Sequence, residues 1–192
     1  MSDRNRHQPA GPRRAMLAAA AAFALLAPAP AAAADDCAPM SAHFVFCAEG
    51  SQWAGARWVQ FGDGSALELG PYYVEFAEHW AGRNASAEQG VTLEGALDAL
   101  LAMMAEAEHD EGMQPPALLM RDQFDTEALT VVRAVKQIDM DDDEPLLMAT
   151  LIAQGEGARI AVIFGNDDET DAAELAQQAR GFVALIRPGQ EG

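Results

Sequence analysis

The chain has 192 residues, of which 30 are acidic and 12 are basic, so its formal net charge at pH 7 is −18. Half of the residues are hydrophobic, which is typical of a folded globular protein. An acidic surface repels nucleic acid and anionic lipid headgroups, so the charge argues against both as partners.

The first 34 residues have the pattern of a secretory signal peptide. A segment with four arginines precedes an alanine-rich apolar run over 15–26, and small residues follow at 31–34. The apolar run is too short for a comfortable membrane span, so we expect cleavage near Asp35. We expect the remaining residues, 35–192, to form a single domain without a stable membrane anchor. Because four arginines and Asp3 leave with the signal, it keeps 8 basic and 29 acidic residues, a net charge of −21.

Two export routes fit this leader. Arg13 and Arg14, followed by apolar residues, are typical of twin-arginine signals. Pro12 precedes the pair where such signals usually have Ser or Thr, so the general secretory route is favoured. Both routes predict a mature protein in the periplasm or outside the cell, where disulfide bonds form.

The only cysteines, Cys37 and Cys47, follow the expected cleavage site. An even pair this close in an exported chain predicts a disulfide bond, and Pro39 between them can turn the chain. A redox or metal-binding pair is the alternative. The spacing matches neither the C-x-x-C redox motif nor common zinc sites, so the pattern favours a structural disulfide.

Short runs with high strand propensity follow the first cysteine. We expect strands over 43–47 and 58–61, with a turn over 62–64 where two glycines flank an aspartate. Over 72–80, the large apolar and aromatic residues at positions 72, 74, 76 and 80 alternate with a more mixed set at positions 73, 75, 77 and 79. This alternation predicts a strand with one buried face.

Two segments repeat apolar residues at helical spacing, which predicts two amphipathic helices. The first is expected to begin after the N-cap Thr92 and to end near Gly112, before two prolines. Its apolar stripe is Leu93, Leu97, Leu100, Leu101 and Met104. The second has capping candidates over 166–168 and a stop signal over 188–189. Its stripe is Leu175, Ala179, Phe182, Val183 and Ile186.

Four further strands are expected between the two helices, over 117–124, 129–138, 146–153 and 159–164. The acidic run over 139–144 and the glycine-flanked segment over 155–157 predict hairpin turns, so the last three strands are antiparallel neighbours. The last two are apolar on both faces and must be covered on both faces. The fold class is therefore α+β, with an antiparallel sheet of about five to seven strands flanked by two amphipathic helices.

This order of elements, with Trp53 and Trp58 in the early strands, resembles the PsbP-like fold, an α/β/α sandwich. The resemblance covers most of residues 42–187: early hairpin strands, a helix, an antiparallel meander and a closing helix. Members of that family are mostly non-enzymatic interaction or accessory proteins, so the resemblance implies a similar role here. It carries over no functional residue.

The sequence contains no motif of known catalytic chemistry. It has no G-x-S-x-G elbow, H-E-x-x-H pair, P-loop or dinucleotide fingerprint. The histidines of the mature chain, His43, His79 and His109, lie far apart along the sequence. We therefore expect neither enzymatic activity nor a cofactor.

Two segments contain metal-ligand residue types, and each has a structural alternative. The first resembles the start of a calcium loop, although it lacks the glycine and glutamate that an EF-hand requires. Its residues are Asp139, Asp141, Asp143 and Glu144. The second offers soft ligands for copper, namely Met103, Met104, His109 and Met113. A solvated hairpin tip is the favoured interpretation of the first, and core packing that of the second.

Aromatic side chains are concentrated between positions 53 and 80. Trp and Tyr are enriched in interfaces and stack on planar ligands, whereas the alternative is that they plug the end of the sheet. The candidate surface comprises Trp53, Arg57, Trp58, Tyr72, Tyr73 and Trp80, with Arg83 nearby. We therefore predict an exported, non-catalytic accessory or binding protein for an unknown protein or small-molecule partner. A periplasmic binder of calcium or copper is the alternative.

Overall fold

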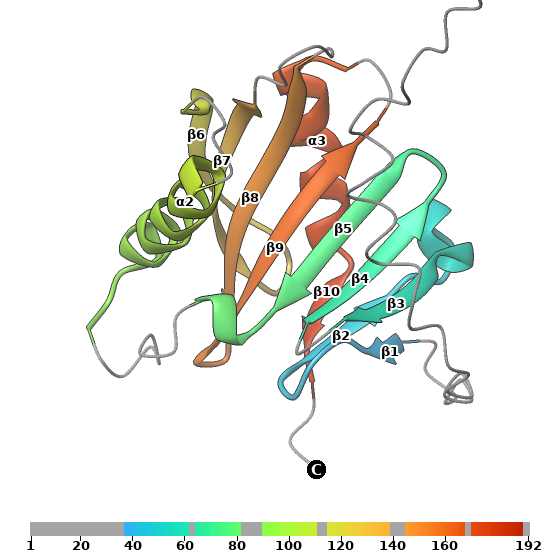
Figure 1. The fold of residues 1–192 in the computed structure, drawn as a ribbon. Helices are drawn as coiled ribbons and strands as arrows, with labels where there is room; N and C mark the ends of the chain where they lie inside the picture. The colour runs from blue at the N-terminus through green and yellow to red at the C-terminus, as the bar shows by residue number, and fades with distance from the viewer. Residues whose placement is uncertain are drawn as a thin grey trace, which may run out of the picture. The chain divides into compact units, whose positions relative to one another are not determined.

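The structure, a computed structural model, describes residues 37–61, 64–81, 90–110, 115–138, 145–167 and 170–189. These residues form two antiparallel sheets, of seven and three strands, and two α-helices (Figure 1). The predicted α+β class is thereby confirmed. No helix in these ranges has the length and apolar character that crossing a membrane requires. The leader predicted over 1–34 lies outside the described residues.

The seven-stranded sheet has the order β3-β4-β5-β9-β8-β7-β6, and all neighbouring strands are antiparallel. Its strands are β3 (Arg57–Phe61), β4 (Gly64–Leu69), β5 (Tyr72–Ala77), β6 (Ala117–Asp125), β7 (Thr130–Ile138), β8 (Leu146–Gly155) and β9 (Ala158–Asn166). The four strands predicted after the first helix are confirmed to within two residues at each end. Glu156 and Gly157 join β8 to β9 with φ angles of 48° and 83°, as a two-residue type I′ hairpin requires.

The N-terminal half of this sheet departs from the prediction in two places. β5 ends at Ala77, and the 3-10 helix η3 (His79–Ala81) follows, so the prediction of a strand over 72–80 is wrong at its end. Nothing in the sequence predicts β4, because Gly64 and Glu68 belong to residue types that are depleted in strands. Pairing with β3 on one side and β5 on the other holds this segment in the sheet.

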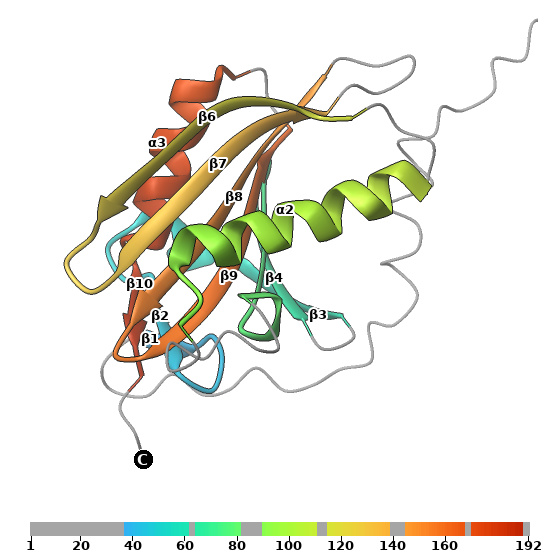
Figure 2. The same ribbon diagram turned by 90° about the vertical axis from the view of Figure 1, so that its left-hand side faces the viewer.

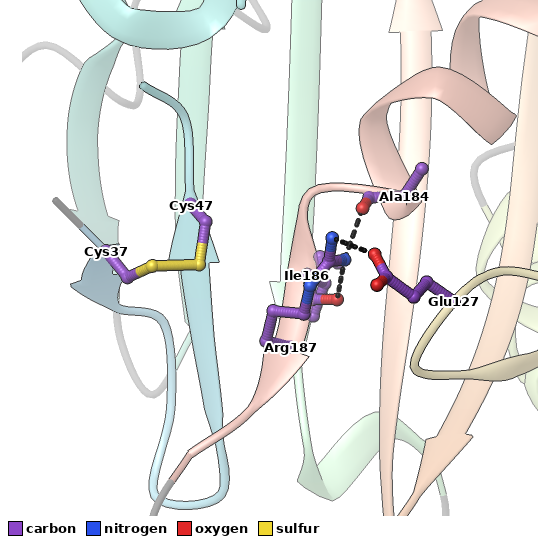
Figure 3. The surroundings of a disulfide bond; sticks show 6 residues. All are labelled: Cys37, Cys47, Glu127, Ala184, Ile186 and Arg187. Carbon is purple, nitrogen blue, oxygen red and sulfur yellow. Dashed lines mark hydrogen bonds and ion pairs between the residues drawn. A yellow bond between two sulfur atoms is a disulfide. The ribbon is translucent and has the colours of Figure 1, made fainter. Parts of the chain in front are cut away.

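The three-stranded sheet joins the two ends of the described chain. Its order is β1-β2-β10, with β1 (Cys37–Pro39), β2 (Phe44–Cys47) and β10 (Ile186–Pro188). Cys37 lies opposite Cys47 in the β1–β2 register, and the predicted disulfide is confirmed by an S–S distance of 2.04 Å. Figure 3 shows this bond near Arg187 of β10, whose guanidinium donates to the Ala184 carbonyl and to Glu127.

The two helices begin at capping side chains. α2 (Leu93–Asp110) begins after Thr92, whose hydroxyl accepts the Gly95 N–H at 3.0 Å, so the predicted cap is confirmed. α3 (Ala172–Val183) is capped by Asp171, which accepts the Glu174 N–H at 2.8 Å. The prediction of a cap within 166–168 is therefore wrong, and residue 166 ends β9 instead.

The end of the second predicted helix also requires correction. α3 ends at Val183, and Ile186 belongs to β10 rather than to the helix. Ile186 is fully buried and pairs with Phe46 of β2. Helical spacing marked it correctly as a core residue, but pairing with a strand about 140 residues earlier in the chain, which has no local signal, set its backbone conformation.

The helices lie on opposite faces of the seven-stranded sheet (Figure 2). Alternate residues of β8 separate into two clusters, with Leu151 packed in the cluster that contains α3 and Ile152 in the one that contains α2. We name these sides the α3 face and the α2 face. The prediction that the apolar strands are covered on both faces is therefore confirmed.

Candidate functional site

Trp53 and Tyr72 belong to the core at one end of the sheet. Trp53 lies in the 3-10 helix η2 (Gln52–Gly55) and is only 3% exposed. The centroid of its ring is 4.8 Å from that of Phe182 and 5.6 Å from that of Tyr72. Tyr72 is half-buried against the same cluster. Both side chains thus occupy the structural position that was the alternative to a binding surface.

Arg57 and Trp58 are neighbours on β3 and therefore point to opposite faces of the sheet. Trp58 pairs with Leu67 on the α3 face, where its ring meets the edges of Phe46 and Phe76. It keeps 39% of its surface exposed. Arg57 lies on the α2 face and forms an ion pair with its cross-strand partner Glu68.

Tyr73 is the most polar of the candidate aromatics. It is 37% exposed and lies on the α2 face, directly opposite Glu68 on β4. Burial raises its pKa well above the ordinary value, and so do a hydrogen bond to the Glu75 carboxylate and the negative charges of Glu75 and Glu68. Tyr73 is therefore a hydrogen-bond donor, and not a phenolate, at any physiological pH.

Trp80 occupies a third position. It lies in η3 and packs, half-buried, against the cluster of the α2 face. The six candidate residues consequently do not form one continuous surface. Arg57 and Tyr73 share the α2 face, whereas Trp58 and Tyr72 share the α3 face with the buried Trp53.

The metal-site candidates are only partly described. All four residues of the proposed calcium loop, 139–144, and Met113 of the proposed copper site lie outside the described residues. Met103 is 51% exposed, whereas Met104 is half-buried and accepts the Thr150 hydroxyl with a donor–acceptor distance of 3.9 Å. Within the described ranges no group of three or more His, Cys, Asp or Glu side chains is placed to hold a metal ion.

The basic side chains in the described part of the chain are engaged within the protein. Most form ion pairs with carboxylates: Arg57 with Glu68, Arg121 with Glu94 and Asp98, Arg133 with Asp122, Lys136 with Glu108, and Arg187 with Glu127. Arg159 donates to Gln154 and to the Val91 carbonyl, and Arg180 lies 4.8 Å above the centre of the Phe124 ring. The exposed surplus charge is therefore negative.

A cavity of about 350 Å³ opens where the turn between β1 and β2 meets the ends of β4 and β5. Figure 1 shows this turn and η3 at the same end of the sheet. Its walls include the apolar side chains of Met40, Phe76 and Ala77 and the polar side chains of Ser41, Ser65 and Glu78. The cavity is open to solvent and brings a carboxylate and two hydroxyls together beside apolar side chains, so it offers hydrogen-bond acceptors to a small polar group.

Glu78 is the charged group of this cavity. Its Oε1 accepts the backbone N–H of His43 at 2.7 Å, and its Oε2 lies 2.8 Å from His43 Nδ1. Burial raises the pKa of Glu78, but the polar influence of the nearby Ser41 hydroxyl and the hydrogen bonds from His43 outweigh it, so the pKa lies below the ordinary value. Glu78 is thus held as a carboxylate at neutral pH.

Sequence reasoning did not identify this cavity. Glu78 and His43 are 35 residues apart and carry no motif, and Ser65 lies in the unpredicted strand β4. No protein-family model matches the chain, and no curated protein sequence matches it.

Proposed function

We propose that the protein is an exported, non-catalytic binding protein whose partner carries positive charge. The observation that carries this proposal is the internal use of the basic side chains. In the ion pairs described above each cation already has a carboxylate partner, whereas further acidic side chains such as Asp125, Asp167 and Glu174 are exposed without a cation partner among those pairs. Complementary charge steers a partner toward such a surface and suppresses partners of like charge.

Two further features support this function. The signal pattern over 1–34 and the disulfide of Cys37 with Cys47 suit an oxidising compartment outside the cytosol. The element order resembles that of PsbP-like proteins, which are mostly accessory proteins without enzymatic activity.

Site-specific photocrosslinking in the native host tests the proposal. A photoreactive residue is placed at Trp58 or Tyr73, the exposed aromatics of the two faces, and at the exposed, uncharged Gln177 on α3 as the control. We expect a crosslinked protein with a basic isoelectric point from at least one aromatic position and none from the control. Crosslinking should fall roughly tenfold between 50 and 500 mM salt, because screening weakens attraction between exposed charges. An acidic product, one that salt does not affect, or none, would contradict the proposal.

A further inference from the structure

The cavity beside Glu78 is suited to one positively charged side chain. Its volume of about 350 Å³ is near the lower end of ligand pockets, which span about 300–1,000 Å³. It therefore admits a single side chain or a small amine rather than a drug-sized ligand. Its charged group is a carboxylate, and the surface around the molecule has a negative surplus.

The hydrogen bonds of Glu78 discriminate between the two basic side chains. A carboxylate accepts about four hydrogen bonds, and each oxygen of Glu78 already has a partner in His43. A guanidinium binds best as a fork that uses both oxygens in parallel, and His43 occupies part of that arrangement. A lysine ammonium is a compact charge with three rotatable donors, so one remaining lone pair of Glu78 and the Ser65 hydroxyl can accept from it.

The rest of the cavity matches the remainder of a lysine side chain. The apolar lining of the cavity comes from Ala42, which is exposed, and from the largely buried Met40, Phe76 and Ala77. A lysine buries its aliphatic stem against such a wall while its charged head reaches a polar group. His79 also lines the cavity.

We propose that this cavity binds the side chain of a lysine presented by the basic partner. The inference rests on the proposed function and names the group by which the partner is recognised. Binding places the lysine ammonium between the Glu78 carboxylate and the Ser65 hydroxyl, with its stem along the apolar lining at Ala42 and Met40.

Peptide titrations followed by NMR test the inference on the mature, disulfide-bonded protein. The probes are the capped peptides Gly-Gly-Lys-Gly-Gly, the same peptide with Arg at the centre, and the same peptide with the uncharged norleucine. We expect the Lys peptide to shift the amide signals of Ser65, Ala77 and Glu78 with a millimolar Kd. The Arg peptide should bind at least about fivefold more weakly, and the norleucine peptide should leave these signals unchanged. Equal binding of Lys and Arg, or no shift with 20 mM Lys peptide, would overturn the inference.

Variants separate the cavity from general charge attraction. Glu78→Gln should weaken Lys-peptide binding at least about tenfold, and Ser65→Val at least about threefold. Glu106 lies on the solvent-facing side of α2, so Glu106→Gln removes the same charge outside the cavity and should leave binding unchanged. If Glu78→Gln fails to fold by circular dichroism, Ser65→Val decides alone. Equal weakening by Glu106→Gln would contradict the inference.

The two proposals fail in different ways. A salt-sensitive basic crosslinking partner without Lys-peptide binding would overturn the cavity inference and leave the proposed function standing. Lys-peptide binding without any basic crosslinking partner would overturn the proposed function and support the cavity as an amine site.

Discussion

The two faces of the seven-stranded sheet are built from different side chains. The α3 face is rich in large aromatics, and its buried members include Phe44, Phe46, Trp53, Phe76, Phe164 and Phe182. The α2 face is filled by smaller aliphatic residues, which are Ala81, Ala96, Leu97, Leu100, Val132, Ala134, Ile152 and Ala161. Because hydrophobic stabilisation scales with the apolar area removed from water, the α3 face contributes more to the free energy of unfolding.

The buried ion pairs of the two faces also differ in how far their carboxylates are exposed to solvent. On the α2 face, Lys136 and Glu108 pair with side chains that are 4% and 10% exposed. On the α3 face, buried Arg133 pairs with Asp122, whose side chain is 40% exposed. Solvent offsets the desolvation of the second pair but not of the first. The fold therefore depends chiefly on aromatic packing at α3. The helix α2 is held by a smaller apolar cluster, beside an ion pair that is removed from water.

The largest expected effect would break the α3 face. Phe182→Ala removes a ring that contacts Phe46, Trp53 and Phe164, and should lower the free energy of unfolding by about 3–5 kcal/mol. Leu97→Ala on α2 should cost less, about 2–3 kcal/mol, because its neighbours are smaller and α2 can settle against them. Urea denaturation measures both values. A larger loss for Leu97→Ala would reverse the ranking of the two faces.

The second prediction concerns the buried pair of the α2 face. Lys136→Met leaves Glu108 without its counter-charge and should cost about 3 kcal/mol. The double variant with Glu108→Leu should return to within about 1 kcal/mol of the wild type, because an apolar pair replaces an ion pair whose desolvation was costly. Thermal and urea denaturation provide the comparison. If the double variant is as unstable as the single one, packing rather than charge explains the loss.

The third prediction tests the small sheet that covers part of the α3 face. Replacing both Cys37 and Cys47 by Ser opens a loop with a sequence separation of 10 residues. The chain-entropy model gives a loss of about 2.7 kcal/mol, chiefly because the unfolded chain gains freedom. Reduced and alkylated wild type should match the variant in urea denaturation. A loss below about 0.5 kcal/mol would show that β2 and β10 hold the sheet without the crosslink.

The smallest effect is expected at the link between the β1–β2 turn and β5. The folded-state pKa of Glu78 lies below its ordinary value of 4.5, so its contribution is fully present above that pH and is lost as the pH falls through the folded value. Glu78→Gln should therefore cost about 1 kcal/mol at pH 7, and the difference from wild type should narrow as the pH falls below 4.5. Urea denaturation across this range measures it, with Glu106→Gln as the control. A difference that stays constant down to pH 3 would exclude an ionised Glu78 as its source.

The long elements could be predicted from the sequence, and the short ones could not. β7, β8 and β9 are continuous apolar runs separated by turn residues, and the stripe of α2 repeats every three or four positions. β4 and β10 have no comparable pattern. They exist because strands that arrive from elsewhere in the chain supply their hydrogen-bond partners.

The candidate site shows the same limit more sharply. An aromatic concentration over 53–80 was visible, but strand alternation places Arg57 and Trp58 on opposite faces, and η2 turns Trp53 into the core. The cavity beside Glu78 depends on His43, which reaches it only because the β1–β2 turn folds over the end of β5. Neither Glu78 nor His43 lies in a sequence motif that would identify it as a cavity residue.

Local patterns in the sequence were sufficient to predict the types of the long elements, the need for cover on both faces of the central strands, and the partner of each cysteine. These properties are local or pairwise, because they follow from side-chain period, turn residues and the number of thiols. The three-dimensional fold was needed to show which face each aromatic occupies, how the two ends of the described chain pair, and where a carboxylate lines a cavity. Those properties depend on burial and pairing summed over segments far apart in the chain, and no short stretch of sequence contains that information.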